Sequence, residues 1–302
     1  MKKSQVLMAL GLAGAGLILR NETRYRLPPG GGPATGLFED GRPGTALITG
    51  GSSGIGATFA RHLAAQGYDL VLVARRQDRL DAVAADLANR HGVNVETCAA
   101  DLATEEGIAR IEECIQGLDH LALLINNAGF ATGGYFARVD PQRHHEMVTL
   151  HVMAPTRLSR AALPGLVRRR RGAIVNVASL AAFVPLPGGA NYSATKAYLV
   201  MFSRGLANES RNRNVQIQAL CPGFTRTELL DSQDVTDEQA NRIPRALWGA
   251  ADDVVTESLA CLAAGGPVIC IPGLKNRALA TLARRLPAPA VDWVLSQRMI
   301  QK

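Results

Sequence analysis

Aromatic residues and paired cysteines are scarce in this chain. Phe, Trp and Tyr make up only 5% of its 302 residues, whereas 47% of the residues are hydrophobic. A hydrophobic fraction dominated by Ala, Leu and Val is typical of helices packed on a parallel sheet, in one large domain or two small ones. The five cysteines form no Cys-x-x-Cys pair and mostly lie in hydrophobic runs. We therefore expect buried free thiols in a reducing compartment, without a disulfide framework.

The central part of the chain also lacks an excess of basic residues. The net charge is +7, but residues 1–45 hold six Lys and Arg against three Asp and Glu, and residues 274–302 hold six against one. The segment between them is therefore close to neutral. A nucleic-acid-binding domain needs its own basic face, so no nucleic-acid partner is expected. Basic ends instead fit a membrane surface or an acidic partner.

Residues 4–19 carry no charge and are bracketed by Lys2, Lys3 and Arg20. As a helix they reach about 24 Å, which is short of the ~30 Å hydrocarbon core of a bilayer. Three readings stay open: attachment to the cytoplasmic side of a membrane, a tail that avoids the membrane, and a cleaved signal peptide. The Pro- and Gly-rich stretch 27–44 indicates a linker.

A glycine-rich turn near residue 50 is the first motif that carries chemistry. The hydrophobic run Thr45–Thr49 has strand character, glycines follow at positions 50, 51, 54 and 56, and residues 57–66 have helical character. Glycines let the backbone approach a pyrophosphate closely, and a helix N-terminus favours its negative charge. The stretch predicts a nucleotide cradle, although a glycine turn alone also occurs in other α/β proteins.

Hydrophobic strands and polar-faced helices alternate through the rest of the chain. This alternation predicts an α/β fold with a single doubly wound parallel sheet of Rossmann type, helices on both faces and a ligand crevice at the strand carboxyl ends. We place this catalytic domain at 45–273, after the N-terminal segment and linker 1–44 and before a basic, amphipathic extension 274–302. The expected strands are 45–49, 69–74, 94–99, 121–126, 173–178, 216–220 and 268–271, and the expected helices are 57–66, 77–90, 104–116, 141–168, 192–211 and 251–264.

Two arginines, Arg75 and Arg76, end the second expected strand, and the first acidic residue after them is Asp78. A site for the unphosphorylated dinucleotide usually has a carboxylate here to hold the ribose hydroxyls, whereas an arginine can pair with a 2′-phosphate. The sequence therefore favours NADP(H). The simpler alternative is a pair of arginines at the start of an exposed helix.

Tyr192 and Lys196 lie four residues apart in an expected helix, so that they share one face. A neighbouring cation stabilises a phenolate and lowers the pKa of tyrosine, as a general acid/base requires. Ser179, just after the fifth expected strand, can hold a carbonyl oxygen or donate to a developing alkoxide. A Tyr-x-x-x-Lys pair alone is weak evidence, and its weight comes from the motifs that accompany it.

Taken together, these motifs resemble the short-chain dehydrogenase/reductase family over about residues 45–271. The resemblance implies a nicotinamide-dependent oxidoreductase in which Asp101 contacts the adenine, Lys196 also holds the nicotinamide ribose and Thr227 seats the carboxamide. No cluster of residues in the sequence has the spacing of metal ligands, so no metal is expected. The catalytic residues it implies are Ser179, Tyr192 and Lys196, together with His151. The cofactor-binding residues are Thr49, Gly50, Ser52, Ser53, Gly54, Ile55, Gly56, Arg75, Asp101, Leu102, Asn127, Ala128, Gly129, Tyr192, Lys196, Pro222, Gly223, Thr225 and Thr227.

His151 stands where the family has an asparagine that is thought to hold a water in a proton relay towards the lysine. Histidine also donates and accepts hydrogen bonds, but its shape and its pKa differ from those of an amide. The departure puts the relay geometry in question and leaves the reaction class unchanged. It also raises the alternative of a cofactor-binding scaffold or regulatory protein with weak or no turnover.

The leading expectation is an NADPH-dependent reductase of a lipophilic ketone or acyl-type small molecule, with Tyr192 as the proton donor. Residues 224–248 match the position of the family's substrate lid, and their hydrophobic members indicate either an apolar substrate or ordinary packing. The extension 274–302 indicates membrane contact or packing over the substrate mouth. Homo-oligomer formation is left open.

Overall fold

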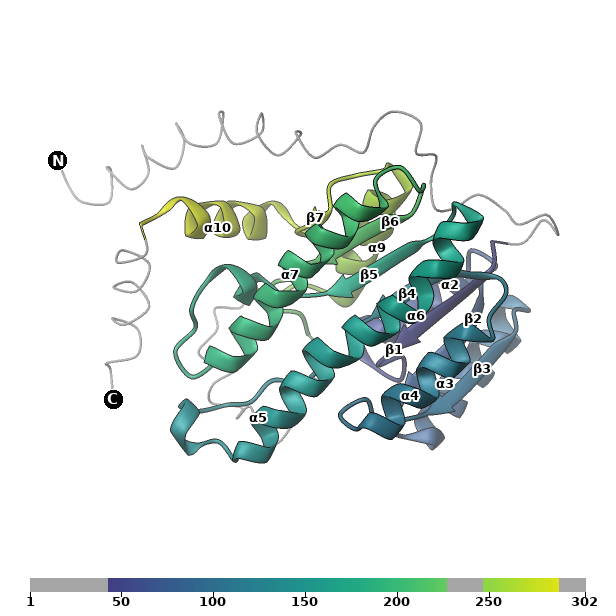
Figure 1. Cartoon of the computed structure of the whole chain (residues 1–302), viewed down its shortest axis with the longest axis horizontal. Coiled ribbons are helices and arrows are strands. Elements are labelled where there is room, and N and C mark those ends of the chain that lie inside the picture. The colour runs from purple at the N-terminus through teal and green to yellow at the C-terminus, as the bar shows by residue number, and fades with distance from the viewer. Residues whose placement is uncertain (1–42, 227–246, 288–302) are drawn as a thin grey trace.

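A parallel seven-stranded sheet, in the order β3-β2-β1-β4-β5-β6-β7, forms the centre of the molecule (Figure 1). The computed structural model describes residues 43–226 and 247–287. The chain moves outward from β1 to β3 and then crosses to β4 on the other side of β1, so the switch point lies between β1 and β4. The strands are β1 (Thr45–Thr49), β2 (Asp69–Ala74), β3 (Val95–Ala99), β4 (Leu121–Asn126), β5 (Ala173–Val177), β6 (Gln216–Leu220) and β7 (Ile269–Cys270).

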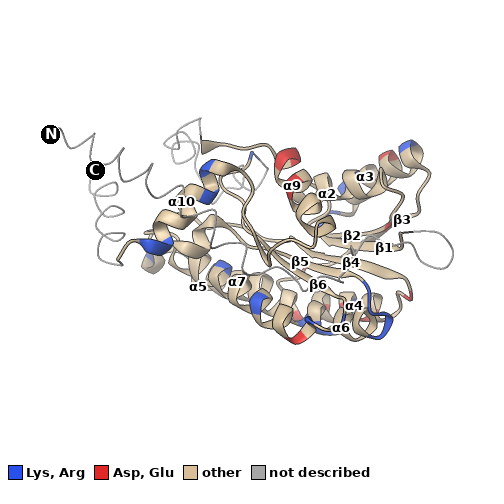
Figure 2. Cartoon of the chain, turned by 90° about the horizontal axis from the view of Figure 1, so that it is seen from above, with Lys and Arg blue, Asp and Glu red and all other residues tan. Residues whose placement is uncertain are grey.

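Helices cover both faces of the sheet, which confirms the predicted Rossmann architecture (Figure 2). One face carries α2 (Gly54–Ala64), α3 (Gln77–His91) and α9 (Ala251–Ala263), and the other carries α4 (Glu105–Gln116), α6 (Ala154–Arg169) and α7 (Ala190–Ser210). The described part also contains α5 (Pro141–Val148), the 3₁₀ turns η2 (Phe136–Arg138) and η4 (Leu180–Phe183), and α10 (Leu274–Arg285).

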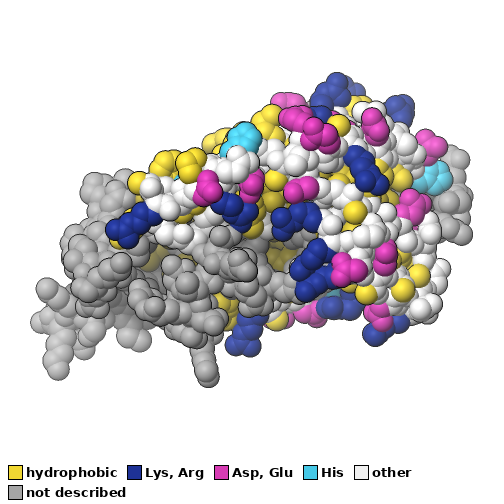
Figure 3. Space-filling view, turned by 90° about the horizontal axis from the view of Figure 1, so that it is seen from below, with side chains coloured by type: hydrophobic (Ala, Val, Ile, Leu, Met, Phe, Trp, Pro, Cys, Tyr) yellow, Lys and Arg dark blue, Asp and Glu magenta, His cyan; other side chains and the backbone are white. Residues whose placement is uncertain are grey.

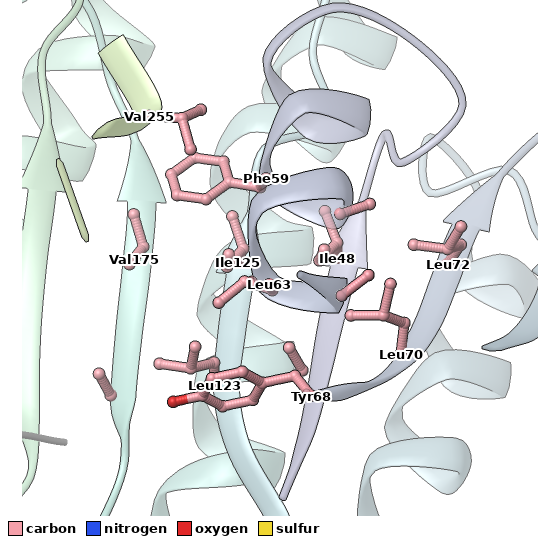
Figure 4. Packing of buried hydrophobic residues seen from close by; sticks show 14 of the residues in the cluster. Ile48, Phe59, Leu63, Tyr68, Leu70, Leu72, Leu123, Ile125, Val175 and Val255 are labelled. Carbon is pink, nitrogen blue, oxygen red and sulfur yellow. The ribbon is translucent and has the colours of Figure 1, made fainter. Parts of the chain in front are cut away.

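The strands β1, β2, β4 and β5 are mostly hydrophobic on both sides because helices bury both of their faces. Figure 4 shows Phe59 and Leu63 of α2 packed over the β1 and β4 side chains, with Val255 of α9 beside the Phe59 ring. Phe59 is fully buried, and its truncation to alanine would cost about 3–5 kcal/mol of stability. This packing fixes the start of α2 directly beyond the end of β1.

The prediction of a single helix over 141–168 is wrong in the middle of that range. The structure divides it into α5, one π-helical turn (Thr149–Met153, η3) and α6. A π turn holds one residue more than an α turn, and such turns concentrate at functional sites. Here the turn carries His151 into the interior, where its exposed fraction is 1%.

The cysteines are free thiols, as predicted, but the expectation that they are buried is only partly correct. Cys221 and Cys270 are buried, whereas Cys98, Cys114 and Cys261 are half-buried. These last three lie in β3, α4 and α9. Each packs against a hydrophobic core cluster with part of its side chain still exposed.

The surface in Figure 3 interleaves basic and acidic side chains, as a solvated surface does. Within residues 43–226 and 247–287, no helix is both long and apolar enough to cross a bilayer. The segment 4–19 and the linker up to residue 42 lie outside the described ranges, as do residues 227–246 and 288–302. What the sequence predicts for them, and the predicted domain borders, stay predictions.

Candidate active site

The glycine turn between β1 and α2 forms a close-packed cradle at the switch point. Gly50 has a φ of +67°, a conformation that favours glycine. A Cβ atom on Gly56 would lie 2.1 Å from the Gly50 carbonyl oxygen, so this position has no room for a side chain. The N-terminus of α2 opens here after Ser53, with Ser52, Ser53 and Ile55 half-buried around it. The geometry suits a phosphate that accepts from backbone N–H groups.

Thr49 and Asn127 join this cradle to the end of β4. The Thr49 hydroxyl accepts from the backbone N–H groups of Asn127 (2.9 Å) and Ala128 (3.0 Å). In the other direction, the Asn127 amide donates to the Thr49 carbonyl oxygen at 2.9 Å. Two loops that are far apart in sequence therefore form one wall of the crevice.

Lys196 is buried on α7 with its ammonium anchored beside Tyr192. Its Nζ donates to the Val177 carbonyl oxygen at 2.9 Å and lies 5.7 Å from the centre of the Tyr192 ring. A side-chain hydrogen bond links Tyr192 to Ser179, which follows β5. Ser179 also caps η4, because its hydroxyl accepts from the Ala181 N–H at 3.1 Å. The three side chains that the sequence singled out thus meet at the carboxyl end of β5.

The protonation behaviour of this group differs from the sequence expectation. Burial raises the pKa of Tyr192 above 10.0, and the hydrogen bond from Ser179 lowers it by a smaller amount. Burial lowers the pKa of Lys196 to about 8, partly opposed by Cys221. Desolvation is the largest influence on both groups, and Lys196 is not among the groups that lower the pKa of Tyr192, so the phenol keeps its proton near neutral pH.

His151 lies in the same interior, with both ring nitrogens hydrogen-bonded. Its Nε2 accepts from the Phe130 N–H at 3.1 Å, and its Nδ1 lies 3.1 Å from the Thr195 hydroxyl. The imidazole ring stands edge-on to the Tyr192 ring, with 5.8 Å between the ring centres. Burial, and secondly the nearby Lys196 charge, holds the pKa of His151 well below 6.5.

Comparison with known proteins agrees with this arrangement. A family model described as short chain dehydrogenase matches residues 44–238, well over half of the chain. This chain belongs to the short-chain dehydrogenase family. The match begins one residue before β1 and includes the glycine cradle, Ser179, Tyr192 and Lys196.

Relatives within the short-chain dehydrogenase family include reductases. The very-long-chain 3-oxoacyl-CoA reductase of Bos taurus is 34% identical over 188 residues, which are 61% of this chain and 60% of the bovine protein. The match therefore spans about three fifths of that relative's length. Among solved structures, a short-chain dehydrogenase from Sphingobium yanoikuyae in complex with NADPH has a TM-score of 0.72 and 35% identity, covering 86% of this chain and 96% of that one. The bulky-bulky ketone specific alcohol dehydrogenase from Comamonas testosteroni has a TM-score of 0.69 and 30% identity, covering 86% and 94%.

Two of the positions predicted to contact the adenosine part of the cofactor are open to solvent. Arg75 and Asp101 are exposed after β2 and β3, whereas Leu102 is buried. The Asp101 carboxylate accepts from the Ala103 N–H at 3.0 Å, which fixes its loop. Within the described ranges Arg75 is in no ion pair with a carboxylate, so its guanidinium is available to a phosphate.

The opposite wall follows β6. Leu180 N–H donates to the Pro222 carbonyl oxygen at 2.9 Å, and the Thr225 hydroxyl donates to the Gly223 carbonyl oxygen at 3.1 Å. The described ends of the expected lid meet at Phe224 and Trp248, whose ring centres are 6.0 Å apart. Thr227 and the rest of that segment, 228–246, lie outside the described residues.

Three contacts of this short-chain dehydrogenase site escaped sequence reasoning. Thr195 and Phe130 provide the partners of His151, and Asn276 of α10 lies against Gly223, where an added Cβ would be 2.6 Å from the amide oxygen. Thr195 lies inside the Tyr-x-x-x-Lys motif, so its position on α7 was available as a signal. The contact between Asn276 and Gly223 depends on tertiary packing, and no local sequence pattern indicates it.

Proposed function

We propose that this protein is an NADPH-dependent oxidoreductase that reduces the carbonyl group of a lipophilic ketone or acyl-type substrate to an alcohol. One observation carries the proposal: the protonated Tyr192 phenol, Ser179 and the Lys196 ammonium gather at the same edge of the sheet as the glycine cradle. The solved relative from Sphingobium yanoikuyae in complex with NADPH supports the choice of cofactor. Reductases among the relatives support the reaction class.

Three side chains of this protein have separate roles in the proposed reaction. NADPH supplies a hydride when it is bound. Tyr192 gives its phenol proton to the carbonyl oxygen as negative charge develops there. The Ser179 hydroxyl holds that oxygen, and the Lys196 ammonium stabilises the phenolate that remains.

The cofactor site that we propose contains the positions given by the sequence resemblance. The cradle of Gly50, Gly54 and Gly56 would hold the pyrophosphate, and Arg75 the 2′-phosphate. Asn127–Gly129 and Pro222–Thr225 would border the nicotinamide, with Thr227 as the further predicted contact. The absence of space at Gly56 supports the fit, because the backbone there can approach a ligand closely.

Hydrophobic side chains near the crevice support a lipophilic substrate. Tyr135 and Phe136 are 47% and 61% exposed in the loop after β4, and Phe224 is 46% exposed after β6. A named relative acts on very-long-chain 3-oxoacyl-CoA, and another is specific for bulky-bulky ketones. These aromatic side chains would contact an apolar substrate at the mouth of the site.

The experiment that tests the function is NADPH oxidation by the purified full chain, followed with a panel of ketones, aldehydes and 3-oxoacyl thioesters of increasing chain length. We expect turnover that improves with the hydrophobic size of the substrate. Tight NADPH binding without reduction of any carbonyl would instead favour the scaffold or regulatory alternative. Preference for small polar carbonyls would contradict the lipophilic substrate class.

Replacing Arg75 by alanine should reduce the preference for NADPH over NADH. Loss of one charge-assisted phosphate contact corresponds to about tenfold or more in relative affinity. Titration of both cofactors with the parent and with Arg75→Ala measures the change. Arg79→Ala, which removes an exposed cation from the first turn of α3, is the matched control and should keep the preference. Equal affinity of the parent protein for both cofactors would refute this role of Arg75.

The orientation of α10 supports a peripheral membrane contact. Two of its arginines contact the protein: Arg277 pairs with Glu257, and the Arg284 guanidinium lies 5.5 Å from the centre of the Phe183 ring. Its leucines turn outward, with Leu279 and Leu282 exposed by 46% and 56%. The helix therefore presents these leucines to solvent.

Anionic lipid is the proposed partner of this face. Lys275 and Arg285 are exposed on α10, the helix contains no acidic residue, and the chain beyond it adds Trp293 and Arg298. Hydrophobic side chains flanked by cations are the pattern of interfacial helices. Together with residues 4–19, α10 would hold the protein at the cytoplasmic side of a membrane.

Vesicle sedimentation tests the attachment. The full chain should sediment with vesicles that contain phosphatidylglycerol and less with pure phosphatidylcholine. Removal of residues 1–26, and separately Leu279→Ser with Leu282→Ser, should each weaken sedimentation several-fold by removing buried apolar area. Unchanged sedimentation of both variants would exclude these segments as the contact. A lower native mass of the leucine variant would instead show that this face joins two copies of the chain.

A further inference from the structure

The hydrogen bonds of His151 have a direction that can be assigned from geometry alone. The backbone N–H of Phe130 is a donor only, so the Nε2 that accepts it at 3.1 Å carries no proton. In a neutral imidazole the proton must then be on Nδ1, which lies 3.1 Å from the Thr195 hydroxyl oxygen. His151 is therefore the Nδ1–H tautomer and donates to Thr195.

The hydrogen bonds continue from His151 through Thr195 to the backbone of Tyr192. The Thr195 hydroxyl accepts from His151 and has one proton left, which it donates to the Tyr192 carbonyl oxygen at 2.9 Å. Thr195 and His151 are 3% and 1% exposed, so water does not compete with either bond. One chain of donors thus runs from the loop after β4, through the imidazole, to the backbone of Tyr192.

The surroundings keep the imidazole neutral and in place. A Cβ on Gly129 would lie 2.9 Å from Nε2 and 3.6 Å from the Lys196 ammonium, so the ring packs directly against this glycine. The neighbouring cation opposes a second positive charge on the ring, as does burial. The far side of Phe130 is held by Arg143, whose guanidinium lies 4.2 Å from the centre of that ring.

We propose that His151 and Thr195 form a positioning pair that fixes the Tyr192 backbone relative to the loop after β4. In this role His151 transfers no proton. It is a positioning residue that acts on the reaction only through Tyr192. Asparagine at 151 offers one acceptor and one donor, so it can preserve the direction of the chain. The inference rests on the proposed reductase function for its kinetic consequence, but the tautomer and the hydrogen bonds are independent of turnover.

Nitrogen-15 NMR of the histidine-labelled full chain tests the tautomer directly. The chain has six histidines, and the spectrum of His151→Asn identifies the signals of His151 by their loss. We expect the neutral Nδ1–H form at pH 7.5. An Nε2–H tautomer, or an imidazolium at this pH, would overturn the proposal whether or not the protein reduces carbonyls.

Kinetics test the effect on Tyr192. Thr195→Val keeps the shape of the side chain but removes its hydroxyl, and should lower kcat about tenfold because the phenol is displaced from its working position. The dissociation constant of NADPH should change less than about threefold, since Thr195 is not a cofactor contact. Thr195→Ser restores the hydroxyl and should recover most of kcat.

Two variants at 151 complete the comparison. His151→Asn should preserve or raise kcat, whereas His151→Leu should lower it to a similar extent as Thr195→Val. Because both residues act through one series of hydrogen bonds, the double variant should lose about as much kcat as either single variant. Full kcat in a folded Thr195→Val protein, or additive losses in the double variant, would overturn the positioning role. Melting curves identify any variant that fails to fold, and for such a variant the NMR result decides.

Discussion

Replacing Tyr192 by phenylalanine is expected to abolish carbonyl reduction while the protein stays folded and binds NADPH. The phenol proton is the only one that we assign to the developing alkoxide, and a general acid of this kind contributes about 10²–10⁴ in rate. The substitution removes one oxygen and keeps the ring, so packing against His151 is preserved. NADPH oxidation with the best substrate of the panel measures the loss, and fluorescence titration measures the retained cofactor binding.

Tyr198→Phe is the matched control for this experiment. Tyr198 lies on the same helix, is 37% exposed, and its hydroxyl lies 2.9 Å from that of Thr156. Removal of this hydroxyl should leave kcat within about twofold, because an exposed hydrogen bond contributes little. An active Tyr192→Phe protein would refute the assignment of the proton donor.

The second large effect is expected at Gly56. A methyl group there would lie 2.1 Å from the Gly50 carbonyl oxygen and 2.6 Å from the Asn127 amide nitrogen. The backbone of the turn must move to accept it, and both neighbours belong to the proposed cofactor cradle. We expect Gly56→Ala to lower NADPH affinity by about 100-fold or more, since several phosphate contacts lose their alignment together. Isothermal titration calorimetry checks this value.

Gly205→Ala provides the control for a glycine in a helix. Apart from the neighbouring backbone of α7 itself, no atom lies within 4 Å of the Cβ that this change would add. Alanine in an open helical position stabilises by up to about 1 kcal/mol, so NADPH affinity should stay unchanged and the melting temperature should rise slightly. If Gly56→Ala bound NADPH as the parent does, the cradle would have to lie elsewhere.

The fold was predictable because most of the strands are compact hydrophobic runs between turn residues. Four of the expected strands, including Thr45–Thr49 and Leu121–Asn126, begin and end where the sequence predicted, and the other three differ by one or two residues. Local patterns decide such elements, since a strand buried on both faces has a uniform composition.

The sequence predicted which residues form the candidate site, but it did not predict their pKa values correctly. Tyr192 and Lys196 are placed together by their spacing on one helix, whereas the raised pKa of the tyrosine depends on burial that no spacing reveals. The orientation of α10 likewise follows from tertiary contacts, among them the pairing of Arg277 with Glu257. Amphipathic periodicity predicts that a helix has two faces, but it does not say which one the protein covers.

The π turn at Thr149–Met153 has a consequence for how this chain can tolerate insertions and deletions. It behaves as one extra residue in an otherwise regular helix. Deleting a residue there would restore an α-helix and leave α5 and α6 in their present register, because the π turn absorbs the extra residue. The side chains inside the turn would change direction, so the imidazole of His151 would lose its hydrogen bond with Thr195. A single-residue gap in this segment is therefore more damaging than a substitution at any of its exposed positions, although it makes the secondary structure more regular.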